Sequence, residues 1–491
     1  MDAVISYAPL WAVVLPIIGA LAINRIPEEQ VRIRNLTAVF TVGINFLIVA
    51  SMLPLILNGA VVELKLLSFI GGLELFFRVD QLGIIFGFTS SLLWIFAIVY
   101  SMGYMSRQPA QGRYFFFFVI SMSATMGVAF AGNLFTMYIF FEYLTLCTYP
   151  LVIHSQSEEA TRSGIKYMVY CFGGGGLILF SLIILNGLVP GATFVPGGIL
   201  ENVTGASPVL LIIIFFMAIL GFGTKGAIMP LHSWLPAAMV APAPVSALLH
   251  AVAVVKSGVF GMTRVLYYIF GPEKTLELGV VDYLAVLVAF SILAGSIIAL
   301  RQKVLKLRLA YSTISQLGYI TLGGLMLTPA GLTGGVIHII NHAILKITLF
   351  FCAGTIIRLT GKTRVDELHG LGKRMPIIMV AFAISGLGLI GIIPICGYLS
   401  KFYLLTGALE GGRLIFAILL LVSAMLNSMY YLPIVINAFF KEGEFEKPKG
   451  FEAPLTMLVP IIILAVMAVF FGLFANQTTI PLVENMVKTV F

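Results

Sequence analysis

Fourteen long apolar runs divide this sequence, and they constrain its fold more than any other feature. Each is roughly 17 residues or longer, enough for a helix to cross a hydrocarbon core about 30 Å thick. Hydrocarbon offers no partners to backbone N–H and C=O groups, so runs of this length predict helices. We therefore expect an all-α polytopic membrane protein with about fourteen transmembrane helices. The runs lie near 8–24, 35–57, 80–102, 114–130, 133–154, 164–186, 208–236, 243–269, 280–299, 309–327, 331–357, 376–408, 413–439 and 455–475.

The position of the basic residues predicts the orientation of the chain. Charged residues make up 10% of the sequence, against about 25% in soluble proteins. The net charge of +8 could suggest an acidic partner, but its distribution favours a membrane and not nucleic acid. Loops that follow odd-numbered runs hold most Lys and Arg, which predicts that these loops are cytoplasmic, in the cell's inner (plasma) membrane, with both termini outside. The odd-loop residues are Arg25, Arg32, Arg34, Arg107, Arg113, Arg162, Arg301, Lys303, Lys306, Arg308, Arg358, Lys362, Arg364, Lys373, Arg374, Lys441, Lys447 and Lys449.

Two of the apolar runs are interrupted by proline and glycine at mid-membrane. The seventh contains "KGAIMPLHSWLP" and the twelfth "GLGLIGIIPICGYLSKFYL". Paired broken helices are typical of transporters built from inverted repeats, with ions handled at the breaks. An offset of five spans inverts topology, so we expect N-terminal helices over 1–110, a first five-helix repeat over 111–270, an inverted second repeat over 271–440 and a final helix within 441–491.

Five lysines fall inside predicted spans, and one carboxylate lies well inside a span. Ionisable groups in a membrane usually line hydrated cavities or pair with one another, so they indicate a charge pathway. The alternative is a lysine that snorkels from near a helix end, and it applies most readily to Lys166. The residues of this set are Glu142, Lys166, Lys225, Lys256, Lys346 and Lys401.

Histidines and hydroxyls extend this set. His338, His342 and Lys346 are spaced i, i+4, i+8, which places them on one helix face, and imidazole can accept and donate protons near neutral pH. His250 lies on the eighth span with Lys256, and His232 lies in the break of the seventh. Core histidines with satisfied hydrogen bonds and a metal site remain alternatives. The hydroxyls expected to order water along the pathway are Ser246, Ser312, Thr313 and Ser315.

The motifs around these residues resemble a known family. The stretch "GFGTKGAIMPLHSWLPAAMVAPAPVSALLHAVAVVKSG" at 221–258, "AYSTISQLGY" at 310–319, "NHAILKITLFF" at 341–351 and "GIIP...GYLSKF" at 391–402 are similar to the antiporter-like proton-pumping subunits. That family covers the D subunit of Mrp-type Na+/H+ antiporters and the related subunits of complex I and membrane-bound hydrogenases. The resemblance implies that Glu142, Lys225, Lys256, Lys346 and Lys401 are the residues that move protons.

Departures from the family pattern narrow the expected membership. The chain lacks the long lateral helix of the distal complex I subunit, and Lys401 replaces the glutamate of another complex I member, which favours an Mrp D or hydrogenase-type subunit. The four cysteines are scattered, and there is no Gly-rich nucleotide loop or cysteine cluster, so we expect no bound cofactor or metal. Any redox chemistry would belong to partner subunits.

The sequence therefore predicts a proton-translocating subunit of a multi-subunit complex. Its partners would be other membrane subunits, lipid, protons and possibly Na+. In this hypothesis Glu142 tunes the proton affinity of Lys225, and the other lysines and histidines carry the proton across mid-membrane. Two alternatives are a complex I-like NADH/ferredoxin:quinone oxidoreductase subunit and a stand-alone secondary transporter. A third is a non-conducting scaffold, which would be expected to lose the buried lysines.

Overall fold

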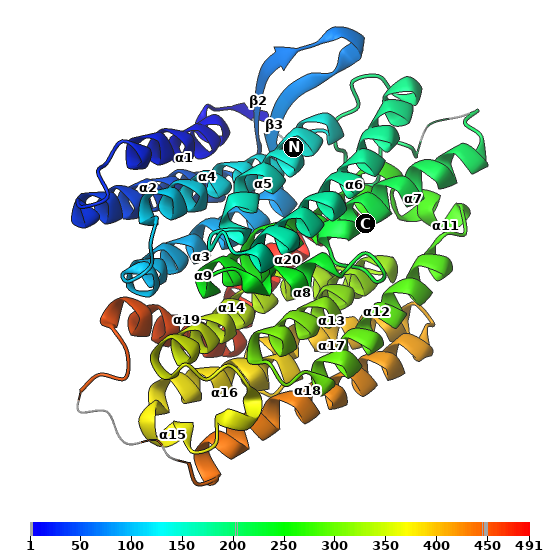
Figure 1. Ribbon diagram of the computed structural model, residues 1–491. Helices are drawn as coiled ribbons and strands as arrows, with labels where there is room; N and C mark the ends of the chain where they lie inside the picture. The colour runs from blue at the N-terminus through cyan, green and yellow to red at the C-terminus, as the bar shows by residue number, and fades with distance from the viewer. Residues whose placement is uncertain (1–2, 202, 204, 444, 446–449) are drawn as a thin grey trace.

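The computed structural model describes residues 3–201, 203, 205–443, 445 and 450–491. Lys447 and Lys449, two of the basic residues used above to predict orientation, lie outside these described residues. The described part is mainly helical, and long helices lie side by side through the molecule (Figure 1). The predicted helical membrane fold is confirmed.

Each predicted apolar run coincides with one helix or with consecutive shorter helices. The first seven runs form α1 (Ala8–Asn24), α2 (Val31–Leu57), α3 (Gln81–Met105), α4 (Gln111–Ala129), α5 (Leu134–Val152), α6 (Glu158–Leu188) and α7 (Pro208–Lys225), with α8 (Trp234–Ala237) after a break. The eighth contains α9 (Ala243–Ala247), η3 (Leu248–Val252), α10 (Val254–Arg264) and η4 (Val265–Phe270). The others form α12 (Val281–Arg301), α13 (Leu305–Leu325), α14 (Pro329–Thr360), α16 (Pro376–Ile390) with α17 (Gly397–Glu410), α18 (Leu414–Phe440) and α19 (Leu455–Leu473).

Short elements complete the described structure. The connecting helices are η1 (Ile70–Gly72), η2 (Ala238–Val240), α11 (Pro272–Glu277), η5 (Val365–Glu367), α15 (Leu371–Arg374) and η6 (Ala475–Gln477), and α20 (Thr479–Val487) follows the last long helix. Among the described helices, 11 are long and apolar enough to cross a membrane, and Ala8–Asn24 and Pro376–Ile390 are shorter apolar helices. The count of fourteen spans stays a prediction.

A small sheet is the element that the sequence analysis did not anticipate. It consists of β1 (Ala3–Ile5), β2 (Val61–Ser68) and β3 (Glu74–Val79), with β1 parallel and β3 antiparallel to the central β2. The β2–β3 hairpin projects beyond the ends of the helices (Figure 1). Gly71, in its turn, has a φ of 79°, a backbone conformation that glycine adopts without steric cost. The loop between the second and third spans is therefore ordered.

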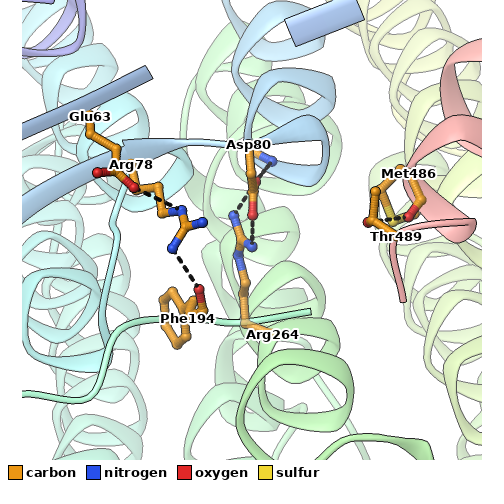
Figure 2. Close-up of polar contacts among 8 residues, drawn as sticks. Glu63, Arg78, Asp80, Phe194, Arg264, Met486 and Thr489 are labelled. Atoms are coloured by element: carbon orange, nitrogen blue, oxygen red, sulfur yellow. Dashed lines mark hydrogen bonds and ion pairs between the residues drawn. The ribbon is translucent and has the colours of Figure 1, made fainter. Parts of the chain in front are cut away.

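A buried ion pair fixes the helix ends next to this hairpin. Asp80 caps α3 by accepting from the backbone N–H of Gly83 at 2.7 Å, and its carboxylate also accepts from both terminal nitrogens of Arg264, one of them at 2.7 Å (Figure 2). Arg78 pairs with Glu63 at 3.3 Å and donates to the carbonyl of Phe194. The Asp80–Arg264 pair ties the start of α3 to the eighth span, and the Arg78 contacts tie β3 to β2 and to the segment after α6.

Two helical segments form the interior of the molecule. The most apolar windows of Ala243–Phe270 and of α14 are completely buried, unlike those of the other candidate spans. The first of these segments widens to π-helix over Leu248–Val252 and again over Val265–Phe270. Single π turns within helices frequently mark functional sites. Both enclosed segments carry buried lysines and histidines.

Neighbouring side chains satisfy the backbone at both predicted helix breaks. At residues 226–233, the backbone N–H of Met229 donates to Ser291 Oγ at 2.9 Å. At residues 391–396, the Asn341 side chain of α14 donates to the carbonyl of Cys396 at 2.7 Å. Irregular backbone at membrane depth is tolerated where protein groups supply such partners. Each break therefore has a backbone group that is paired with a side chain of a neighbouring helix.

Candidate functional site

Glu142 and Lys225 lie at the first of the two breaks. Lys225 ends α7, is fully buried, and donates to the carbonyl of Phe141, the residue before Glu142 on α5. Its ammonium also lies 3.5 Å from the centre of the Phe141 ring. The carboxyl oxygens of Glu142 have no hydrogen-bond partner among the described residues. Lys225 therefore reaches the backbone beside Glu142 and not the carboxylate itself.

A glycine on α6 makes room for the Glu142 carboxyl. A Cβ at Gly175 would overlap the carboxyl group of Glu142. Gly175 lies within four consecutive glycines at 173–176, a run that is unfavourable in a helix interior because glycine loses the most backbone entropy there. The close approach at Gly175 accounts for one of the four.

Lys256 and His342 connect the two enclosed helical segments. Lys256 Nζ lies 2.8 Å from His342 Nδ1, and both side chains are buried. At this distance a proton can pass directly between the two nitrogens. His342 Nε2 has no partner among the described residues, and neither ring nitrogen of the buried His250 has one. These buried nitrogens are therefore not held by a protein partner in this part of the structure.

Lys346 lies among hydroxyl groups. Its ammonium donates to the carbonyl of Leu309 at 2.9 Å, to Tyr431 Oη at 3.1 Å and to Ser312 Oγ. Ser312 and Tyr431 also bond to each other at 3.0 Å. The predicted stripe of His338, His342 and Lys346 does lie on α14, but its members have partners on different helices.

Lys225, Lys256, His342 and Lys346 are called the row below, and His338 extends this row toward the second break. Its Nδ1 lies 2.8 Å from Ser400 Oγ on α17, and its Nε2 lies 3.0 Å from Gln316 Oε1 on α13. The rings of His338 and His342 are 5.9 Å apart between centroids. His342, His338 and Ser400 thus form a polar line that ends one residue before Lys401.

Lys401 lies at the second break. Its ammonium donates to the carbonyls of Leu389 and Ile390 at 2.6 and 2.9 Å, the last carbonyls of α16. A cation at this position is favoured by the negative end of the helix dipole. Lys401 also lines a cavity of about 260 Å³ together with Tyr319 and Tyr398. The residue is half-buried, so it lies where the buried row approaches the surface.

Lys256, Lys346 and Lys401 form no ion pair with a carboxylate among the described residues. Among the described residues, the ion pairs within 4.0 Å do not include Lys256, Lys346 or Lys401. The described residues also contain no group of three His, Cys, Asp or Glu side chains that could hold a metal ion.

One known protein family matches the part of the chain that holds this row. The family described as NADH:quinone oxidoreductase/Mrp antiporter, transmembrane, matches residues 131–427, more than half of the chain. The chain belongs to this family. The resemblance predicted from the motifs is confirmed, and Glu142, Lys225, Lys256, Lys346 and Lys401 all lie within the matched region.

Several relatives of this antiporter family member are themselves parts of larger complexes. It is 34% identical to the N subunit of the NADH-quinone oxidoreductase of Desulforudis audaxviator, covering 78% of each chain. It is 29% identical to the D subunit of the Na+/H+ antiporter of Bacillus subtilis, over 84% of this chain and 82% of that protein. It also matches longer antiporter A subunits, of which it spans between 48% and 63% of the length.

A solved structure shows the same fold. The Mrp complex of Dietzia sp. contains a chain with a TM-score of 0.87 and 20% identity, covering 99% of this chain and 97% of that one. The helical architecture of this family member is therefore that of a membrane subunit in a known assembly.

Other predicted site residues lie apart from the row. Lys166 is exposed on the outer face of α6 and does not join the buried lysines. His232 is half-buried in the first break, with its ring centroid 6.2 Å from that of Tyr311. The hydroxyls of Ser246 and Thr313 bond to backbone carbonyls of their own segments. Ser315 contacts other hydroxyls on neighbouring helices.

Several polar residues near the row were not predicted from the sequence. Gln316, Ser400 and Tyr431 touch His338 or Lys346, although each is uncharged and sits in an apolar run. Lys306, assigned to a loop, donates to the carbonyls of Met239 and Ala241 at 2.6 Å each. Gln316, Ser400 and Tyr431 are polar residues within predicted spans. A polar residue within an apolar run is the same signal that identified the lysines, so it could have identified these three as well.

Proposed function

We propose that this chain is the proton-translocating antiporter-like subunit of a multi-subunit membrane complex, either an Mrp-type cation/proton antiporter or a hydrogenase-type respiratory complex. The observation that carries this proposal is a row of four lysines inside the protein: Lys225 at the end of α7, Lys256 and Lys346 on the two enclosed helical segments, and Lys401 on α17. Three of these amines are buried and the fourth is half-buried, and ionisable groups placed inside a membrane protein at such cost favour a function over packing.

Glu142 has a separate role in this proposal. Its unpartnered carboxyl lies next to the backbone that holds Lys225, so a small movement of either group changes their attraction. At an effective dielectric of about 20, two unit charges about 4 Å apart attract by about 4 kcal/mol, enough to alter the protonation equilibrium by several powers of ten. Glu142 would thereby decide when Lys225 holds or releases its proton.

The architecture and surroundings of the site belong to the same proposal. Helices α4 to η4 and α12 to α18 would form two inverted five-helix repeats, each with one broken helix. Both termini would face outward from the cell membrane, as the basic loops favour. Exchange for Na+ is proposed because the antiporter relatives are subunits of Na+/H+ antiporters, and contact with other membrane subunits is proposed because these relatives are themselves subunits.

A second candidate is a proton-pumping subunit of an NADH- or ferredoxin-dependent quinone oxidoreductase. The 34% identity to an N subunit over 78% of both chains favours it. The subunits that purify with the chain separate the two candidates. Small cation-antiporter subunits would indicate the Mrp type and a nickel–iron module the hydrogenase type, whereas a quinone-reducing module would indicate the second candidate.

The experiment that tests the proposal uses Glu142→Gln, which removes the charge and keeps the size. Proton transport is measured in inverted membrane vesicles and normalised to the amount of assembled complex. We expect Glu142→Gln to abolish transport, and Glu159→Gln, on the exposed first turn of α6, to leave it unchanged. Undiminished transport by assembled Glu142→Gln complex would refute the role of Glu142.

A further inference from the structure

Helix α13 carries a broad polar stripe whose two flanks face different neighbours. Ser312, Ser315, Gln316 and Tyr319 lie on one side of the helix by their spacing. Gln316 points to His338 on α14, as described above. Ser315 instead contacts α12 and α18. The histidine row therefore occupies only one flank of the stripe.

The other flank ends in a cluster of three serine hydroxyls. Ser296 Oγ of α12 lies 2.8 Å from Ser315 Oγ and 3.0 Å from Ser423 Oγ of α18, and Ser315 lies 3.4 Å from Ser423. All three side chains are fully buried or nearly so. A hydroxyl both donates and accepts, so the cluster can reverse the direction of its hydrogen bonds without moving any helix.

This serine cluster lies between the polar groups around Lys346 and those around Lys401. On one side, Ser312 and Tyr431 accept from Lys346. On the other side, the hydroxyl of Tyr319 is buried without a partner among the described residues, and its ring lies 5.2 Å from Lys401 Nζ. Three helices therefore align hydroxyl groups between Lys346 and Lys401.

An amide links the same flank to the second break. Asn427 lies between Ser423 and Tyr431 on α18, at i+4 from Ser423. Its side-chain nitrogen donates to the carbonyl of Leu389 at 3.4 Å, and that carbonyl also accepts from Lys401. The polar contacts of α18 thus reach the group that holds the Lys401 ammonium.

We propose that protons have two parallel routes between the central lysines and Lys401. The histidine route runs through His342, His338 and Ser400. The hydroxyl route runs from Lys346 through Ser312 and Tyr431 to the Ser296–Ser315–Ser423 cluster and Tyr319, with water bridging each turn of α13, since adjacent turns are about 5–6 Å apart. In the second route one proton leaves Lys346 as another is released toward Lys401, and the hydroxyls between them reorient. This inference rests on the proposed function.

Parallel routes predict a specific pattern of variant effects. His338→Ala interrupts the first route, and Ser315→Ala with Ser423→Ala interrupts the second. We expect each interruption alone to slow transport by less than about tenfold, and the two together to slow it about tenfold more than the product of the separate effects, as expected for coupled groups. Ser423→Thr, which keeps the hydroxyl, restores the second route, and Ser428→Ala, whose hydroxyl bonds only within its own helix, is the matched control.

The measurement is proton transport in inverted vesicles, normalised to assembled complex, with Glu142→Gln as the inactive reference. His338→Asn replaces His338→Ala if the latter fails to assemble. The proposal is overturned if either interruption alone abolishes transport, because the routes would then act in series or only one would carry protons. It is also overturned if the combined effect equals the product of the separate ones. Normal transport by Glu142→Gln would instead refute the proposed function, whatever the serine variants do.

Discussion

Removing the charge of Asp80 leaves the Arg264 guanidinium, which is 1% exposed, without an opposing charge. Breaking a buried ion pair by removing one partner costs about 3–5 kcal/mol. The Asp80 side chain is 11% exposed, so we expect Asp80→Asn to cost about 3 kcal/mol, the lower end of that range. Asparagine can still cap α3, whereas Asp80→Ala also loses the bond from Gly83 and should cost about 1 kcal/mol more.

A compensating variant separates charge from packing. Arg264 lies over three aromatic rings, the nearest being Tyr268 with its centroid 4.3 Å from the guanidinium carbon. Methionine packs well against such rings, so Asp80→Asn combined with Arg264→Met should recover most of the lost stability. Asp282→Asn is the control, because its ion pair with Arg413 involves a carboxylate that is 83% exposed.

The assay heats the purified complex in detergent and measures by gel filtration the fraction that stays assembled. We expect resistance to heating to fall in the order wild type, double variant, Asp80→Asn and Asp80→Ala, with Asp282→Asn close to wild type. Asp80→Asn as stable as wild type would refute the assigned cost of the unpaired charge. A double variant weakened by the sum of both single effects would show that the two side chains are not coupled.

Two further predictions concern single basic residues. Lys225→Ala and Lys225→Arg should both lose proton transport in assembled complex, because guanidinium retains its proton at all physiological pH values; transport by the arginine variant at the wild-type rate would remove Lys225 from the pathway. Burial and the nearby Arg113 lower the pKa of His154, in the turn after α5, below its usual value of about 6.5. The unfolded chain then binds a proton more readily than the folded one, so His154 stabilises the protein above about pH 6.5 and this contribution is lost as pH falls. Heating at pH 8 and pH 5 should show a smaller difference for His154→Leu than for wild type, and an equal difference would contradict this reasoning.

The helices and the breaks were predictable because one chemical requirement determines them. Hydrocarbon imposes length and apolarity on a span, so the run near 413–439 matches α18 to within one residue at each end, and the run near 35–57 ends with α2 and begins four residues after it. Proline and glycine positions likewise indicated the interruptions after Lys225 and before Lys401. The β2–β3 hairpin was missed because it lies in a loop, where the membrane imposes no pattern.

The partners of the buried side chains were not predictable from spacing alone. The i, i+4, i+8 positions placed His338, His342 and Lys346 on one helix, but Lys256 comes to His342 from a segment 86 residues earlier. Such contacts depend on how helices pack, which a single sequence does not encode in any local pattern. The same limit applies to Gln316 and Tyr431, because their contacts with side chains of α14 are not apparent from their positions in the sequence.

Among the described residues, no carboxylate forms an ion pair with Lys256, Lys346 or Lys401, and in the proposed function this would limit how many charges the row holds at once. Two unit charges about 10 Å apart, at an effective dielectric of about 20, repel by about 1.7 kcal/mol, more than a tenfold change in occupancy. A second proton that enters the row would therefore favour release of the first, so that one extra proton at a time is held. Proton uptake at one end of the row and proton release at the other would be coupled by electrostatic repulsion alone. The subunit would then transfer one proton at a time, and no helix would have to move between steps.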